Sequence, residues 1–149
     1  MSLVNRIKWI KNVKRNDGSD WAYMEDSEAE NFNLAFSKSH GAGAAKPAKG
    51  DIIVLFQTIT DSNIAIPSTY LTHFVLVDSD VQLPENRTAY PYERSVIVLA
   101  RSQTLKSDEI ELSFEDVNTG QLCRFDLFNK TKSPEYNRRR IVDLFNPFF

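Results

Sequence analysis

Two apolar runs decide the fold, Lys49-Gly50-Asp51-Ile52-Ile53-Val54-Leu55-Phe56-Gln57 and Tyr70-Leu71-Thr72-His73-Phe74-Val75-Leu76-Val77. Both are rich in β-branched and aromatic residues, and polar or turn-forming residues precede each of them, which is typical of strands. Because apolar residues occupy adjacent as well as alternate positions, we expect both faces of each strand to be covered. The two runs therefore predict central strands of a wrapped sheet or small barrel.

The chain of 149 residues has the length of one domain, and we expect residues 1–149 to form a single unit. Hydrophobic residues make up 42% and charged residues 26%, as is usual for a globular protein. The net charge of −2 excludes a global basic field, so a nucleic-acid site must be a local patch. The sequence lacks an apolar signal core and a membrane-length apolar run, which predicts a cytoplasmic protein without membrane contact.

Cys123 is the only cysteine, which excludes an internal disulfide and a thiolate metal cluster. A buried structural thiol is the favoured interpretation, and a nucleophilic role stays open. Only two histidines occur, His40 and His73, so neither a metal site nor a cofactor is expected. No nucleophile elbow or P-loop is present, and we expect a protein without catalytic residues, while an enzyme is not excluded.

The N-terminal part predicts a strand and a helix. Residues 6–15 suit a strand whose outer side is basic and whose inward side carries Ile7, Trp9 and Val13. Ser27 is typical of a helix N-cap, and the apolar residues after it recur at helical spacing, namely Ala29, Phe32 and Phe36. We therefore predict a short helix from Glu28 to Ser37.

The C-terminal part predicts further strands and a last helix. Residues 95–101 form an apolar run, and residues 108–115 alternate so that three side chains face inward, namely Ile110, Leu112 and Phe114. Residues 122–128 should return as the hairpin partner. Ser133-Pro134 begins a helix to Phe145 that docks Ile141, Leu144 and Phe145. The fold class is mixed α+β, mainly β: a small barrel of five to seven strands with a short helix after strand 1 and a C-terminal helix.

This order of elements resembles the PUA-like superfamily, and within it the EVE-type domains. Ile7-Lys8-Trp9-Ile10 resembles the Trp-bearing first strand of that family. Trp21 with Ala29-Glu30-Asn31-Phe32 is similar to its Trp-then-Ala-x-Asn-Phe segment, and Gly50–Phe56 to its Gly-Asp turn before a central strand. The resemblance covers residues 6–101, and it departs from the family at Asn12–Arg15, where a lysine–serine–glutamate–proline stretch is usual.

The resemblance implies a module that recognises modified bases in DNA or RNA. Such a module needs a concave aromatic pocket for an unstacked base and polar groups that contact the base edge. The candidate ligand-binding residues are Trp21, Tyr23, Gln57, Thr58, His73, Tyr90 and Tyr92. Each also has a structural interpretation, and Trp9 is expected to be structural. The sequence leaves open which base is bound and whether the nucleic acid is DNA or RNA.

Two basic clusters are candidates for contacts with a nucleic-acid backbone. The first comprises Lys8, Lys11, Lys14 and Arg15, and the second Arg138, Arg139 and Arg140. Each cluster alone is better explained as an ordinary solvated face. If the two clusters met in space, binding of phosphates would become the favoured interpretation.

Two further functions remain open. The first is a small-ligand-binding protein or an enzyme that uses the same pocket with His73 as acid or base. The second is an interaction module that binds a protein partner, or another copy of itself, through an apolar C-terminus formed by Phe145, Phe148 and Phe149.

Overall fold

The structure is a computed structural model that describes residues 3–14, 21–23, 31–36, 44–60, 68–79, 92–107, 109, 112–114, 117–127 and 132–149. One sheet has the strand order β2-β5-β4-β3-β1-β6. Its strands are β1 (Ile7–Asn12), β2 (Asn31–Phe36), β3 (Ile52–Ile59), β4 (Ser68–Val77), β5 (Tyr92–Lys106) and β6 (Leu122–Arg124). The helical segments are α1 (Leu3–Arg6), η2 (Phe125–Leu127), α3 (Pro134–Phe145) and η3 (Asn146–Phe148).

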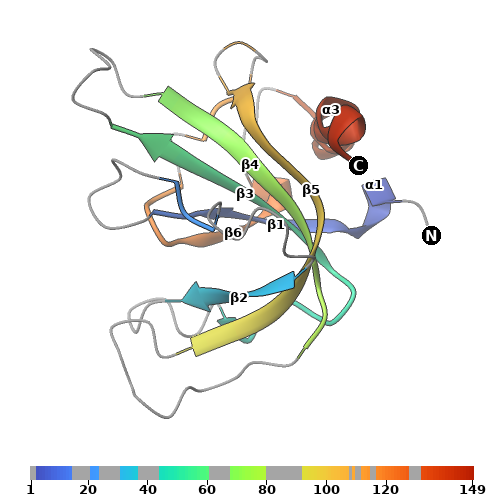
Figure 1. The fold of residues 1–149 in the computed structure, drawn as a ribbon. Helices are drawn as coiled ribbons and strands as arrows, with labels where there is room; N and C mark the ends of the chain where they lie inside the picture. The colour runs from blue at the N-terminus through green and yellow to red at the C-terminus, as the bar shows by residue number, and fades with distance from the viewer. Residues whose placement is uncertain are drawn as a thin grey trace.

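The sheet curls into a half-barrel (Figure 1). The long strand β5 pairs with β2 through its first half and with β4 through its second half. Its register against β4 shifts at two places, and such irregularities increase the local twist. The curl brings β1 close to β2, because Lys11 Nζ lies 4.6 Å from the ring centroid of Phe36.

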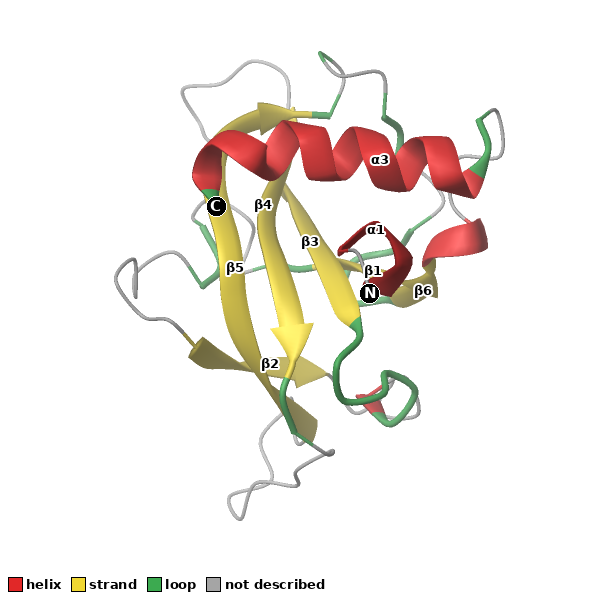
Figure 2. Cartoon of the chain, turned by 90° about the vertical axis from the view of Figure 1, so that its right-hand side faces the viewer, coloured by secondary structure: helices red, strands yellow, loops and turns green. Residues whose placement is uncertain are grey.

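Two apolar clusters lie on opposite faces of this sheet. Helix α3 crosses the outer face over β3, β4 and β5 (Figure 2), where Phe145 packs against Phe74 at a ring distance of 5.6 Å. The inner face is filled by residues such as Leu34, Phe36 and Leu55, each with no exposed surface. Burial on both faces is what the unbroken apolar runs of β3 and β4 predict, and that prediction is confirmed.

The C-terminal helix is also confirmed, with the predicted bounds Pro134–Phe145. Ser133 caps it, because its hydroxyl accepts a hydrogen bond of 3.1 Å from the backbone N–H of Tyr136. Ile141 and Phe145 are buried, and Leu144 packs partly against the same cluster. Helix α1 contacts α3, so the two ends of the chain lie on one side of the molecule (Figure 1).

The predicted helix from Glu28 to Ser37 is wrong over the described residues 31–36, which form β2. The stretch Asn31-Phe32-Asn33-Leu34-Ala35-Phe36 also has a period of two, and six residues pair with β5 in the antiparallel sense. Leu34 and Phe36 are fully buried while Asn31 and Asn33 are exposed. Pairing with β5 and burial of alternate side chains therefore override the helical spacing.

The predicted hairpin of residues 108–115 with 122–128 is also wrong over the residues that the structure describes there, which are 109, 112–114 and 122–127. Leu112 and Phe114 are buried as expected, but the described residues 112–114 form no strand. The strand β6 pairs with β1 instead, in the antiparallel sense. Asn12 directs this pairing, because its side-chain amide donates to the carbonyl of Val117 at 3.0 Å and its carbonyl accepts from the N–H of Gly120 at 2.7 Å.

The predicted face of β1 needs one correction. A register shift between Ile7 and Trp9 places Ile7 in the outer cluster beneath α3. Trp9 and Val13 pack in the inner cluster, as expected, and Ile10 joins Ile7 on the outer face. The strict alternation assumed for residues 6–15 fails at this shift.

Candidate functional site

Three segments that are distant in sequence bring aromatic rings together on the inner face. Tyr23 and Phe32 stack with centroids 4.5 Å apart, and the ring of His73 lies edge-on to both, at 6.4 Å from Tyr23 and 5.6 Å from Phe32. These three residues form what we call the ring cluster. It unites one residue of β2, one of β4 and one of the segment 21–23, although Phe32 was not among the predicted ligand-binding residues.

The segment 21–23 is fixed in place by hydrogen bonds to two strands. The N–H of Ala22 donates to Gln57 Oε1 at 3.0 Å, and the hydroxyl of Tyr23 accepts from the N–H of Ala35 at 3.0 Å. Tyr23 has a φ of 61°, a left-handed conformation that is costly for a residue with a Cβ. The surrounding contacts maintain this conformation, so the position of the Tyr23 ring is a built feature of the fold.

His73 has no exposed surface, and its Nδ1 lies 2.8 Å from the hydroxyl oxygen of Thr72. The pKa of His73 is lowered from 6.5 to about 3, chiefly by burial and also by the positive charge of Arg101, while the backbone of Tyr23 opposes the change. No hydrogen bond of ordinary geometry joins Nε2 to another described residue. The imidazole is therefore neutral at pH 7 and contributes an uncharged ring to the cluster.

A second pair of rings is partly exposed. Trp21 and Tyr70 are half-buried and meet edge-to-face, with centroids 5.0 Å apart. We call Trp21 and Tyr70 the rim pair. Trp21 lies two residues before Tyr23 in the chain, and Tyr70 lies three residues before His73. Lys106 Nζ lies 6.0 Å from the ring centroid of Tyr70. Tyr70 and Lys106 were missed from sequence, although Tyr70 begins the predicted strand that carries His73.

The remaining predicted ligand-binding residues have other surroundings. Gln57 is buried and holds Ala22, as described above. The hydroxyl of Thr58 is exposed and lies 2.7 Å from that of Thr69 across the β3–β4 pair. Tyr92 is half-buried against the inner apolar cluster, and Tyr90 lies outside the described residues.

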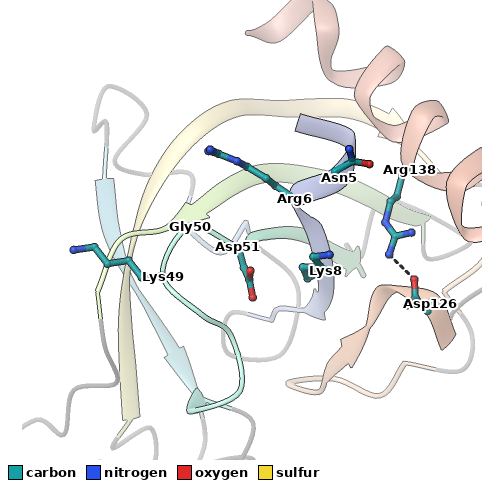
Figure 3. Close-up of a pocket in the computed structure, with 8 residues that line it drawn as sticks. All are labelled: Asn5, Arg6, Lys8, Lys49, Gly50, Asp51, Asp126 and Arg138. Atoms are coloured by element: carbon teal, nitrogen blue, oxygen red, sulfur yellow. Dashed lines mark hydrogen bonds and ion pairs between the residues drawn. The ribbon is translucent and has the colours of Figure 1, made fainter. Parts of the chain in front are cut away.

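A basic pocket lies on another part of the molecule, beside α1 and α3 (Figure 3). It is a cavity of about 640 Å³, and its charged lining residues are Arg6, Lys8, Lys49, Arg138, Asp51 and Asp126. Arg6 and Lys8 come from α1 and β1, Asp126 from η2 and Arg138 from α3. Lys49 and Asp51 flank Gly50, whose φ of +97° favours glycine at the turn before β3.

The walls of the basic pocket are held by specific bonds. Arg138 Nε donates to the carbonyl of Ile7 at 2.8 Å, and its guanidinium also pairs with Asp126. Asp51 Oδ2 accepts from Trp9 Nε1 and from the N–H of Ala48, both at 2.9 Å. The pocket therefore has one rigid wall at Arg138 and another at the turn that carries Lys49.

The basic pocket joins the two predicted basic clusters, because Lys8 belongs to the first and Arg138 to the second. Arg6 and Lys49 complete it and were not named as site residues, although Arg6 lies with Lys8 on the basic outer side predicted for residues 6–15. Lys14 and Arg140 are exposed outside this lining, as is Arg139, which pairs with Glu135 at 3.0 Å. Arg15 lies outside the described residues.

Lys11 does not belong to a surface cluster. Only 2% of it is exposed, and its ammonium donates to the carbonyl of Gly120 at 2.8 Å. Burial lowers its pKa from 10.5 to about 8. This lysine links β1 to the turn before β6 and is too deeply buried here to contact a phosphate.

The C-terminal aromatic residues divide into two groups. Phe145 has no exposed surface and belongs to the outer core, so it is not part of a docking surface. Phe148 and Phe149 are 39% and 49% exposed, although the ring of Phe149 also meets Phe74 at 5.4 Å. Within the described part of the chain, no group of three metal-ligating side chains is found, and no helix is long and apolar enough to cross a membrane.

Comparison with known proteins identifies a similar fold and no family. No family model matches the chain, and no curated protein matches it. Its structure is similar to that of a hypothetical protein from Leishmania major, with a TM-score of 0.57 and 10% sequence identity. The match covers 97% of this chain and 98% of that one, so the two share an architecture over nearly their whole length.

Proposed function

We propose that this chain is a PUA-like, EVE-type module of the cytoplasm that binds nucleic acid and reads an unstacked, modified base at the ring cluster and rim pair. The observation that carries the proposal is the convergence of Tyr23, Phe32 and His73 from three distant segments, two of which also carry the half-exposed pair Trp21 and Tyr70. Flat rings held on a rigid scaffold are what a base-binding site requires.

The base stacks on the rim pair. Tyr23 and Phe32 lie directly against each other, so a base cannot enter between them in this arrangement. Trp21 and Tyr70 keep part of their surface exposed and offer the stacking face instead. Stacking of a base on an aromatic side chain contributes about 1–3 kcal/mol. The ring cluster, in which His73 is neutral, adds packed and uncharged rings on the same segments of the chain.

Binding without catalysis agrees with the state of His73. A general base works best when its pKa is near the working pH, and burial lowers the pKa of this histidine to about 3. An imidazole with that pKa accepts protons weakly at pH 7. The alternative in which His73 serves an enzyme as acid or base is therefore disfavoured.

Titration of single-stranded oligonucleotides tests the proposal, with modified and unmodified bases at two salt concentrations. We expect Trp21→Ala to weaken binding by about 1–3 kcal/mol, which is the loss of one stacking contact. Tyr136→Ala is the matched control, because Tyr136 is a 48% exposed aromatic residue of α3, away from the rim pair. The proposal fails if the wild-type chain does not bind at low salt, or if the two variants lose affinity equally.

A docking role for the C-terminus is a second candidate, carried by the exposure of Phe148 and Phe149. Exposed aromatic residues at the end of a chain favour contact with a protein partner or with a second copy. Analytical ultracentrifugation of the full chain and of the variant Phe148→Ser/Phe149→Ser tests it. A wild-type chain that stays monomeric at high concentration contradicts self-association.

A further inference from the structure

We propose that the basic pocket binds a phosphate monoester, the dianionic group found at the end of a nucleic-acid strand or on a small sugar phosphate. The proposal is independent of base recognition at the rim pair. It rests on the cavity of about 640 Å³ and on the charges that line it.

The charge balance of the pocket favours a dianion. The described residues that line it include four cationic side chains and two carboxylates, which together carry a net charge of +2. A phosphate monoester carries about −1.5 to −2 at pH 7, whereas an internal phosphodiester carries a single charge. A monoester therefore neutralises the pocket and a diester does not.

The two carboxylates are already occupied by partners in the fold. Asp126 pairs with Arg138 and lies 3.9 Å from Arg124, and Oδ2 of Asp51 accepts two hydrogen bonds from Trp9 and Ala48. Within the part of the chain that the structure describes, the side chains of Arg6, Lys8 and Lys49 form no hydrogen bond or ion pair. None of the described residues therefore competes with an incoming anion for these three cations.

The arrangement in Figure 3 suits a ligand that enters from outside. Arg138 is fixed at one wall by Ile7 and Asp126, while Arg6 and Lys49 extend along the opposite side of the cavity. Both side chains are long, and among the described residues neither has a partner whose bond would break if it turned inward. A terminal phosphate also projects from the end of its molecule, so it can enter a recess more easily than an internal phosphate, which is joined to the strand on both sides.

The test compares ligands that differ only in a terminal phosphate. Calorimetric titrations of the full chain use a tetranucleotide with a 5′-phosphate, with a 3′-phosphate or with neither, together with ribose 5-phosphate and inorganic phosphate. We expect one phosphorylated end to bind about tenfold more tightly than the unphosphorylated strand at low salt, since charged hydrogen bonds contribute at that scale. Equal affinity for all three strands, with no binding of ribose 5-phosphate, overturns the proposal.

A charge-matched pair of variants locates the effect. Arg6→Gln/Lys8→Gln/Lys49→Gln removes the three available cations, and Lys14→Gln/Lys132→Gln/Arg140→Gln removes three exposed cations outside the pocket. Only the first variant should lose the preference for the phosphorylated ligand. An equal loss in both variants means that overall charge, and not the pocket, attracts the ligand, which also overturns the proposal.

The ligand titrations distinguish phosphate binding at the basic pocket from the proposed nucleic-acid function. If ribose 5-phosphate binds and oligonucleotides do not, the phosphate pocket stands and the proposed nucleic-acid function fails. If Trp21→Ala weakens strands with and without a phosphate by the same factor, both sites act on one ligand. Because no histidine is found among the described residues that line the pocket, the affinity should also rise as the pH passes through about 6, where the phosphate gains its second charge.

Discussion

The ring cluster and the basic pocket differ in how many of their side chains have partners within the described part of the fold. In the ring cluster, each ring is packed against the others, the Tyr23 hydroxyl is hydrogen-bonded and His73 is neutral. In the basic pocket, Arg6, Lys8 and Lys49 extend along a cavity without partners among the described residues. The ring cluster is therefore packed like a hydrophobic core, whereas the basic pocket has charged side chains that can bind a ligand.

This difference indicates which side chains can contribute to the free energy of ligand binding. A packed ring cluster gains little from a ligand unless the ligand contacts its rim, so stacking falls to Trp21 and Tyr70. Unpartnered cations gain charge-assisted hydrogen bonds when an anion arrives. The two regions also depend on different parts of the fold, and variants can therefore change one without the other.

The largest expected effect comes from Arg94, which holds residues 44–47, the segment that leads to Lys49 of the basic pocket. This arginine is 2% exposed and donates to the carbonyls of Ser79, Ala44 and Pro47 at 2.9, 2.8 and 2.7 Å. Arg94→Met leaves these carbonyls without that donor, and we expect it to lower the free energy of unfolding by about 3 kcal/mol or more. Urea denaturation measures the change.

Arg124→Met is the control for Arg94, because its side chain is 65% exposed and should change stability by less than about 0.5 kcal/mol. Arg94→Lys, which keeps the charge, should fold and weaken phosphate binding more than oligonucleotide stacking at the rim pair. If Arg94→Lys weakens both to the same extent, the two regions are not separable.

The second effect concerns the neutral state of the ring cluster. The pKa of His73 is about 3 in the folded chain and 6.5 in the absence of burial, so below pH 6.5 the unfolded chain takes up a proton that the folded chain excludes. Stability is therefore lost as the pH falls from 6.5 towards 3, by about 2 kcal/mol between pH 7 and pH 5. His73→Gln should remove this part of the pH dependence.

His40→Gln, at the other histidine of the chain, provides the comparison for His73. Thermal or urea unfolding at several pH values measures both variants against the wild type. Identical pH profiles for the wild type and His73→Gln mean that the histidine is not held neutral in the folded state.

Much of the fold was predictable because the sequence features that specify it are short motifs or unbroken apolar runs. The apolar runs of β3 and β4 specify strands covered on both faces, and Ser133-Pro134 specifies where α3 begins. β2 was not predictable from spacing alone, since Phe32 and Phe36 suit a helix as well as alternate positions of a strand. The partner strand β5 decides between the two, and it lies about 60 residues further along the chain.

The candidate site was predictable in part for the same reason. Lys8 and Arg138 are recognisable as surface cations, but only the packing of α1 against α3 brings them to one cavity. Lys11 differs because the curl of the sheet covers it with Phe36, which the alternation of β1 does not reveal. Phosphate binding and base reading remain proposals, and the variants above distinguish them.

The smallest expected effect, that of Tyr23→Phe, tests whether the ring cluster only supports the fold or also contacts the ligand. Tyr23→Phe keeps the ring that stacks on Phe32 and removes only the hydroxyl that accepts from the N–H of Ala35. We expect a loss of about 1 kcal/mol in the free energy of unfolding and faster hydrogen exchange at Ala35. Tyr136→Phe, on the exposed side of α3, should change neither.

In Tyr23→Phe, oligonucleotide affinity should change by less than about twofold, because the base stacks on Trp21 and Tyr70. If Tyr23→Phe weakens binding as much as Trp21→Ala does, the ligand reaches the Tyr23 hydroxyl, and the ring cluster must open to admit it.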